Sequence, residues 1–457
     1  MDDSERRSRI RWVVVHPDRP AVLLVERAGA LALPETELPT KVWTADAKAI
    51  LPALRELVGF DAVLLGCVRE HEDESARVLA ATLMATPRAA APPGPGARWA
   101  GREDLAGAAF PRHDQAMVAG VLDELAEGPA GSGRAPWAAR GWFQAAEGWL
   151  RGSLDTIGDV ATGPVQQVQL WELSCILRVP TVRGDVWFKA SRDSPLFVNE
   201  AVLTRELAGL FPDHVPAPVA VDAERRWLAL RDFGAELGWD APVEVREDVL
   251  RTFARLQVRA APEVDRLLRA GCLDRRLAWL SAQAEGWLPA VEETGRLAGI
   301  DAATWLSGGE VAELAAAGPR LAAMCYELAA FAVPATLLHG DLHLSNVAKG
   351  PAGYLFFDWT DACVAHPFLD MIMVFHEKDG ALRDRLRDAY LAEWTRFEPP
   401  DRLRRAWELA EPLGALHHAV SYRSIVANLD PPIDLHMMQS TAYWLRKVIA
   451  GLRRPIS

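Results

Sequence analysis

Alternating apolar and polar positions mark the first part of the chain. Residues 11–26 predict two strands joined by a His-Pro-Asp-Arg-Pro turn. Apolar positions at helical spacing predict a helix over 45–58, and alternating runs predict strands over 62–68 and 77–84. We therefore expect a small α/β domain over residues 1–126.

A linker and a helix are predicted to follow this domain. Residues 127–136, EGPAGSGRAP, have the composition of a linker. The helix-like segment 137–154 carries the aromatic residues Trp142, Phe143 and Trp149. We expect this aromatic stripe to pack onto the next domain rather than to bind a ligand.

The remainder of the chain changes from strand-like to helix-like patterning. Three alternating runs over 164–190 predict an antiparallel meander with Lys189 near the end of its third strand. A helix is predicted over 195–211, and a strand pair with a hinge is predicted to end near residue 234. From Val243 onward the period is mainly helical. The pattern predicts an α+β chain with a small antiparallel-sheet lobe and a large helical lobe.

One stretch within the helical part is patterned differently. Residues 337–359, LLHGDLHLSNVAKGPAGYLFFDW, predict two short strands that flank a polar loop. Asp341 lies in the loop, Asn346 follows five residues later, and Asp358 ends the second apolar run. Phosphoryl transfer uses such a set, because one carboxylate accepts the proton of a hydroxyl while an amide oxygen and a second carboxylate hold Mg²⁺.

This stretch resembles the catalytic segment of the aminoglycoside phosphotransferase and choline kinase group, which shares the protein-kinase-like fold. The shared motif is H-G-D-x-H-x-x-N followed by a strand that ends in F-D-W. The resemblance implies that Asp341 is the catalytic base, that Asn346 and Asp358 bind the metal, and that Asp370 supports the loop. The family often has Pro-Gly before the Asn, where this chain has Leu-Ser at 344–345, a departure that affects loop conformation rather than ligands.

The resemblance also implies a nucleotide site in the small lobe. Lys189 would bind the α- and β-phosphates of ATP, held by Glu200 or Glu206, of which Glu200 matches the family position better. The chain has no G-x-G-x-x-G motif, and the turn at Ser174 is the best candidate to cover the phosphates. Backbone groups of residues 230–232 would meet adenine.

Two other interpretations apply to the histidines of the loop. His339, Asp341 and His343 could ligate zinc, although that interpretation leaves Asn346 and Asp358 unexplained. Alternatively, His339 and His343 only brace the loop, which is the interpretation we favour for both.

The first domain resembles a Nudix fold. Leu33-Pro34 corresponds to the family's Leu-Pro-Gly-Gly turn, and residues 56–59, Glu-Leu-Val-Gly, correspond to the end of the Nudix box. A Nudix helix needs several carboxylates on one face to bind metals, whereas only Glu56 occupies such a position here. We therefore expect a degenerate Nudix-like module without hydrolase activity that serves docking or regulation.

Composition limits the function classes. The formal net charge of −12 over 457 residues argues against a nucleic-acid partner. Five cysteines without a C-x-x-C pair fit a reducing compartment. The N-terminus lacks the apolar core of a signal peptide, and no apolar run reaches the roughly 18 residues of a membrane span. These features predict a cytoplasmic protein with no membrane partner.

Together, these observations predict an ATP- and Mg²⁺-dependent phosphotransferase that acts on a hydroxyl of a small-molecule alcohol. Its kinase domain would span 137–457, with the small lobe near 160–235 and the large lobe near 240–457. The alternative is an inactive nucleotide-binding sensor or scaffold, and the missing carboxylates argue against a Nudix hydrolase. The acceptor and the oligomeric state stay open. Acidic residues of the large lobe either suit a cationic acceptor or are surface charges: Glu408, Glu411 and Asp434.

Overall fold

The computed structural model divides the chain into two compact units. The first unit ends at Arg192, and the second begins at Asp193 and includes the C-terminal helix. The structure describes the following residues: 6–27, 29–73, 76–105, 112–127, 134–297, 305–350, 352–429 and 435–454.

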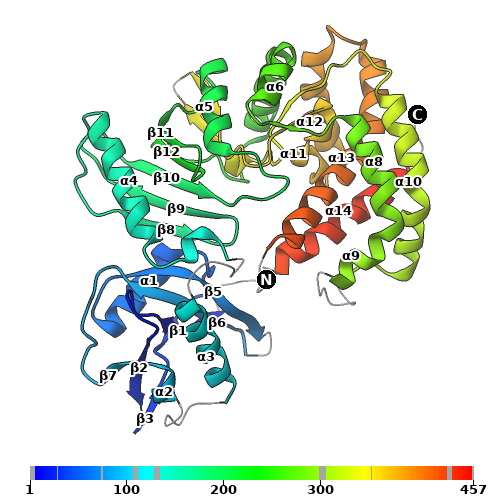
Figure 1. The fold of residues 1–457 in the computed structure, drawn as a ribbon. Coiled ribbons are helices and arrows are strands. Elements are labelled where there is room, and N and C mark those ends of the chain that lie inside the picture. Colours follow the sequence, from blue (N-terminus) through cyan, green and yellow to red (C-terminus); the bar gives the residue numbers. More distant parts are fainter. Residues whose placement is uncertain are drawn as a thin grey trace. The chain divides into compact units, whose positions relative to one another are not determined.

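Two sheets build the N-terminal part of the first unit (Figure 1). The first sheet has the order β4-β1-β6-β5, in which β1 is parallel to β6 and the other neighbours are antiparallel. The second sheet has the order β3-β2-β7. Their bounds are β1 (Arg7–Val14), β2 (Val22–Arg27), β3 (Ala30–Ala32), β4 (Glu35–Leu38), β5 (Ala62–Asp73), β6 (Val78–Pro87) and β7 (Ala97–Ala100). The predicted strands are confirmed, although β5 and β6 run longer than predicted.

Three helices accompany these sheets: α1 (Ala47–Val58), α2 (Arg102–Leu105) and α3 (Arg112–Glu127). The Asp46 side chain caps α1 by accepting from the Ala49 N–H, and Gly59 ends the helix with a φ of 79°. The buried face of α1 includes Ile50 and Leu54. The helix predicted over 45–58 is confirmed, and most of the predicted linker lies outside the described residues.

The predicted meander is confirmed as β8 (Gln166–Leu170), β9 (Ser174–Val179) and β10 (Val186–Ser191), all antiparallel. It is preceded by the short 3-10 helix η2 (Pro136–Ala138) and by α4 (Trp142–Thr156). Trp142 and Trp149 of α4 meet Phe188 of β10 edge-on, with ring centroids 6.0 and 5.7 Å apart. The aromatic stripe therefore packs onto the sheet, as predicted.

The second unit opens with a helix and a strand pair. α5 (Glu200–Leu210) starts five residues later than predicted, because Asn199 accepts from the Val202 N–H and caps the helix there. β11 (Pro218–Asp222) and β12 (Trp227–Arg231) pair antiparallel. Residues 337–359, which carry Asp341, Asn346 and Asp358, are called the catalytic stretch below. The segment after β12 is hydrogen-bonded to this stretch, since the Leu237 N–H donates to the Val347 carbonyl at 2.9 Å.

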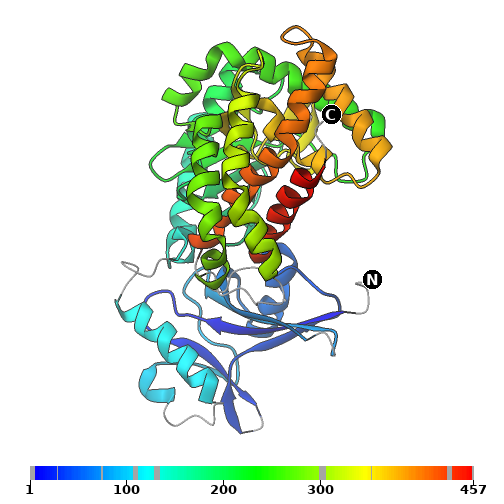
Figure 2. The same cartoon turned by 90° about the vertical axis from the view of Figure 1, so that its right-hand side faces the viewer.

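Helices make up most of the second unit, as predicted. Figures 1 and 2 show α8, α10, α13 and α14 side by side. Their apolar faces share one core with the catalytic stretch. The helices are α6 (Val243–Ala260), α7 (Val264–Arg269), α8 (Leu277–Trp287), α9 (Val291–Leu297), α10 (Gly308–Leu328), α11 (Ile372–Phe375), α12 (Gly380–Leu391), α13 (Pro400–Ala427) and α14 (Leu435–Arg453). Among the described helices, none is both long and apolar enough to span a bilayer.

Besides β11 and β12, the described part of this unit contains five short strands. They are β13 (Leu273–Asp274), β14 (Thr336–Leu338), β15 (Val347–Gly350), β16 (Gly353–Phe356) and β17 (Cys363–Ala365). β14 and β16 are the two strands predicted around the polar loop. The other three were missed, because strands of two to four residues are too short to show an alternating period.

Candidate active site

The site is built on the loop between β14 and β15. All three residues of β14 are buried, which anchors the start of the loop in the core. The loop ends in the 3-10 helix η5 (Leu344–Asn346), and the chain returns through the antiparallel pair of β15 and β16. This arrangement places Asp341 and Asn346 in one loop and Asp358 two residues after β16.

Asp341 and Asn346 lie together, as predicted. The Asn346 Nδ2 donates to the backbone carbonyl of Asp341 at 2.9 Å and lies 3.4 Å from the Asp341 Oδ2. Because its nitrogen faces the loop, Asn346 keeps its amide oxygen as the atom suited to a hard cation.

His343 contacts both of these residues. Its Nε2 lies 3.3 Å from the Asp341 Oδ2 and 3.3 Å from the Asn346 Nδ2. Burial raises the pKa of Asp341, but the hydrogen bond from His343 and the charges of both histidines outweigh it, so the pKa lies below its ordinary value. Burial lowers the pKa of His343, but the Asp341 hydrogen bond and nearby carboxylates leave it raised. Asp341 is therefore ionised at neutral pH.

Asp358 has an uncommon backbone conformation. Its φ of 64° lies in the left-handed region, which non-glycine residues adopt mainly where surrounding structure enforces it. The Thr360 hydroxyl lies 3.0 Å from both the Asp358 Oδ1 and the Glu200 Oε2. Glu200, the first residue of α5, is buried and belongs to the surroundings of Asp358. Glu206 instead pairs with Arg266 at 3.2 Å. The assignment of Glu200 as the partner of Lys189 stays a prediction.

Two buried side chains hold the loop in place. The Asp370 Oδ2 accepts from the backbone N–H groups of His339 at 2.6 Å and Gly340 at 3.0 Å. The His339 Nε2 donates to the carbonyl of Phe357 at 2.8 Å, which ties the loop to the residue before Asp358. Burial raises the pKa of Asp370 to about 7 and lowers that of His339 to about 4. The bracing interpretation of His339 therefore agrees with the structure, as does the supporting role expected of Asp370.

Gly340 is required by the packing of the loop. Its φ is +86°, and a Cβ at this position would lie 2.1 Å from the carbonyl oxygen of Asp361. A Cβ cannot fit there without a movement of the backbone, and the positive φ is in addition strained for any residue with a side chain.

The candidates of the first unit lie on the meander. Lys189 is on β10 opposite Ile176 of β9. Ser174 begins β9 and is buried, and its hydroxyl accepts from the indole N–H of Trp171 at 2.8 Å. The structure thus gives Ser174 a role in holding the turn before β9.

Sequence reasoning missed Thr360 and Trp239. Thr360 follows Asp358 by two residues, but a hydroxyl there carries no distinctive signal. Trp239 is 57% exposed and stacks on His343, with ring centroids 5.2 Å apart and planes 25° apart. The exposure of Trp239 is not visible in the sequence, so a tryptophan just before a predicted helix gave no signal of this contact.

The zinc interpretation gains no support from the geometry. Across the described parts of the chain, no group of three or more His, Cys, Asp or Glu side chains is placed to hold a metal ion. The pair Asn346 and Asp358 supplies only oxygen ligands, which suit Mg²⁺.

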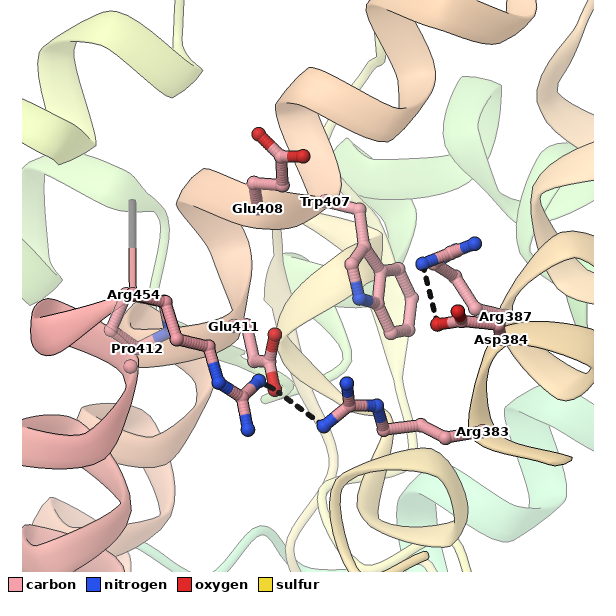
Figure 3. Close-up of a pocket in the computed structure, with 9 residues that line it drawn as sticks. Arg383, Asp384, Arg387, Trp407, Glu408, Glu411, Pro412 and Arg454 are labelled. Atoms are coloured by element: carbon pink, nitrogen blue, oxygen red, sulfur yellow. Dashed lines mark hydrogen bonds and ion pairs between the residues drawn. The ribbon is translucent and has the colours of Figure 1, made fainter. Parts of the chain in front are cut away.

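A separate surface pocket of about 280 Å³ lies among α12, α13 and α14 (Figure 3). Glu411 forms ion pairs with Arg383 and Arg454, and Arg387 pairs with Asp384 at 2.8 Å. The charged side chains of the pocket therefore neutralise one another, and Glu411 acts as a surface ion-pair partner. Asp434 lies outside the described residues. The pocket is lined by Arg383, Asp384, Arg387, Trp407, Glu408, Glu411, Pro412, Gly451 and Arg454.

The loop with Asp341 and Asn346, the following Asp358 and the large helical region define the protein-kinase-like fold. The chain belongs to the phosphotransferase enzyme family, whose model matches residues 176–406, just over half of the chain. The matched range contains Lys189, Glu200 and the whole catalytic stretch. Ser174 lies two residues before it.

Solved structures of similar fold include three small-molecule kinases. A choline/ethanolamine kinase family protein from Mesorhizobium loti is 16% identical, with a TM-score of 0.47, 68% of this chain covered and 95% of the other. The choline kinase LicA from Streptococcus pneumoniae is 11% identical, with a TM-score of 0.46 and coverage of 67% and 99%. The macrolide 2'-phosphotransferase MphH from Brachybacterium faecium is 18% identical, with a TM-score of 0.39 and coverage of 63% and 99%. No curated protein matches the chain in sequence.

Proposed function

We propose that this protein is an ATP- and Mg²⁺-dependent kinase that transfers the γ-phosphoryl group to a hydroxyl of a small molecule. The observation that carries the proposal is the placement of Asp341, Asn346 and Asp358 around one loop, within a family of phosphotransferases. An ionised carboxylate beside two oxygen ligands for Mg²⁺ is the machinery that this reaction requires.

In the proposed reaction, Asp341 orients the acceptor hydroxyl and receives its proton. The Asp341 Oδ2 already faces His343 and Asn346, so the Oδ1 is the atom available to the acceptor. The hydroxyl oxygen forms a bond to the γ-phosphorus while the bond to the bridging oxygen breaks, and ADP leaves. Lys189 is assigned to the α- and β-phosphates by the resemblance.

Asn346 and Asp358 would hold Mg²⁺ through oxygen atoms. When bound, the ion neutralises the phosphate charges. Thr360 and the enforced φ of Asp358 fix the direction of its carboxylate. Catalysis would then depend mainly on positioning and charge stabilisation.

The decisive experiment is a coupled ADP-release assay with Mg·ATP and a panel of amino alcohols, sugars and aminoglycosides. We expect Asp341→Ala to lower acceptor-dependent release by about 10²- to 10⁴-fold while Mg·ATP still binds in calorimetry. Asp358→Ala should weaken Mg·ATP binding as well. Asp401→Ala, at a side chain that is 98% exposed on α13, is the matched control and should keep full activity.

Two results would contradict the proposal. Near-normal turnover by Asp341→Ala would exclude that residue as the base. Failure of the wild-type protein to bind Mg·ATP would exclude a kinase, whereas tight binding without turnover of any acceptor would favour a nucleotide sensor.

A further inference from the structure

The turn between β8 and β9, residues 171–173, is held by side chains from its own unit. Its first residue, Trp171, donates its backbone N–H to the Ser174 carbonyl at 3.1 Å and its indole N–H to the Ser174 hydroxyl at 2.8 Å. The carbonyl of Leu173, at the other end, accepts from the Arg192 N–H at 2.9 Å. The turn thus has one defined conformation without any glycine.

A second tryptophan fixes the turn from the segment that follows the predicted linker. The indole N–H of Trp137, in η2, donates to the backbone carbonyl of Trp171 at 2.9 Å. Trp137 is only 3% exposed, so water cannot readily replace this hydrogen bond. The Trp171 carbonyl therefore has a buried partner from outside the meander.

The Nudix-like module reaches the same turn. Trp43, in the segment between β4 and α1, meets Trp171 edge-on with ring centroids 5.8 Å apart. Two residues further on, the Ala45 carbonyl accepts from the Leu170 N–H at 2.9 Å. We call Trp43, Trp137 and Ser174, which surround Trp171, the Trp171 clamp.

The module is also fixed along the edge of β8. The Gln167 side chain, only 7% exposed, accepts from the Leu64 N–H at 2.7 Å and donates to the Leu64 carbonyl at 3.0 Å. It thereby satisfies both backbone groups of a residue on β5, as a neighbouring strand would. Arg88 donates to the Val165 carbonyl at 2.8 Å and pairs with Glu147 of α4 at 2.9 Å. The module is therefore joined to β8 at Gln167 and Leu170 and to Val165, the residue before this strand.

We propose that the Nudix-like module and η2 together act as a positioning region, which holds the β8–β9 turn in one conformation through the Trp171 clamp. By the resemblance, this turn covers the nucleotide phosphates. The inference rests on the proposed kinase function. Backbone N–H groups bind phosphate only when the turn that carries them is held in place. A glycine-rich loop closes onto its ligand, whereas this turn, Trp-Glu-Leu, is held by Trp43 of the module and by Trp137 of η2. The module contributes to nucleotide affinity without a catalytic carboxylate of its own.

The test is Trp137→Phe in the full-length protein, which keeps an aromatic ring and removes the indole N–H. We expect the Kd for Mg·ATP, measured by calorimetry, and the KM for ATP to rise about five- to tenfold. The KM for an acceptor found in the panel should change less than twofold. Hydrogen exchange of the amides at 171–174 should accelerate about tenfold, while the amides of β10 keep their rates. Loss of stability alone would not produce this separation.

Trp99→Phe is the matched control, because Trp99 lies on β7 in the other sheet of the module and contacts His16. It should leave both constants and the exchange of the turn unchanged. If Trp137→Phe fails to fold, Trp43→Ala replaces it, since Trp43 is 48% exposed, and a two- to threefold rise in the Kd for Mg·ATP is expected.

The outcomes separate the two proposals. An active enzyme whose Kd for Mg·ATP and turn exchange are the same in Trp137→Phe and wild type would overturn the positioning role alone. A wild-type protein that does not bind Mg·ATP would overturn the kinase proposal, and the role of the clamp in nucleotide binding with it.

Discussion

Helix α1 of the N-terminal module and the candidate catalytic stretch of the second unit differ in how they place polar side chains. The buried face of α1 is entirely apolar, and Glu56, the one Glu that matches the Nudix pattern, is exposed. In the catalytic stretch polar groups are buried among apolar ones, as with His339, Asn346 and the supporting Asp370. Burying polar groups costs stability unless they are paired, and such costs concentrate at functional sites.

This contrast teaches that the two regions serve different ends. In the catalytic stretch Asp358 has a left-handed backbone conformation, and the buried Asp370 that supports the stretch has a raised pKa. These features accompany the fixed positions of Asp341, Asn346 and Asp358. The buried residues of α1 are all apolar, and the helix, which contains Pro52, ends in an ordinary glycine cap. A helix whose buried face holds no polar group is suited to a positioning role, which is the role proposed for the module.

The largest effect on stability is expected at Gly340 in the candidate catalytic stretch, and it is compared with the effect at Gly59, which ends α1. Gly340→Ala places a Cβ 2.1 Å from the Asp361 carbonyl oxygen at a φ of +86° and should cost about 2–5 kcal/mol. Gly59→Ala meets no heavy atom within 4 Å at a φ of +79° and should cost about 1–2 kcal/mol. Hydrogen exchange of the amides in each unit measures both. Equal costs would show that the loop around Gly340 relaxes freely.

The next effect is a pH dependence confined to the second unit. Burial raises the pKa of Asp370 to about 7, above the value near 4 expected in an unfolded chain. The folded state therefore holds this proton to higher pH, and the contribution of Asp370 to stability is complete below about pH 4 and is lost as the pH rises to about 7. Asp370→Asn keeps an acceptor for the His339 and Gly340 N–H groups and does not titrate.

We therefore expect the Tm difference between Asp370→Asn and wild type to shift in favour of the variant as pH rises from 4 to 7. The corresponding difference in the free energy of unfolding changes by at most about 1.4 kcal/mol per pH unit. Asp401→Asn, at an exposed position, should follow the wild type throughout. A Tm difference between Asp370→Asn and wild type that stays constant from pH 4 to 7 would show that ionisation of Asp370 does not change the stability of the folded state.

The two strands and the proximity of Asp341 and Asn346 could be predicted from the sequence because they are local, whereas the catalytic and metal-binding roles stay predictions. Asp341, Asn346 and Asp358 lie within 18 positions, and the motif fixes their order. Thr360 and Trp239 could not be found in this way, because their importance depends on contacts: Thr360 with Glu200, 160 positions away, and Trp239 with His343. The start of α5 was missed because the Asn199 cap overrode a helix-like pattern that began at residue 195.

The Trp171 clamp was hidden for the same reason. Ser174 was assigned to a phosphate-covering turn, but nothing in the pattern indicated that Trp43 and Trp137 would meet Trp171. No pattern in the sequence shows which tryptophans far apart along the chain will contact one another. The Nudix resemblance and the domain boundaries also stay predictions, since sequence patterns define elements more firmly than they define how modules join.

The smallest effect is expected at Glu56, and it tests the contrast directly. Glu56 is exposed on α1, so Glu56→Gln should change the free energy of unfolding by less than about 0.5 kcal/mol. If the module is only a scaffold, the variant should also keep the wild-type Kd for Mg·ATP and the wild-type rate of ADP release. Both proteins should show no hydrolysis of nucleoside diphosphate substrates above the buffer rate. A hydrolysis rate that falls with Glu56→Gln would instead show that one carboxylate on an exposed helix suffices for metal-assisted chemistry, and the distinction between the two regions would no longer hold.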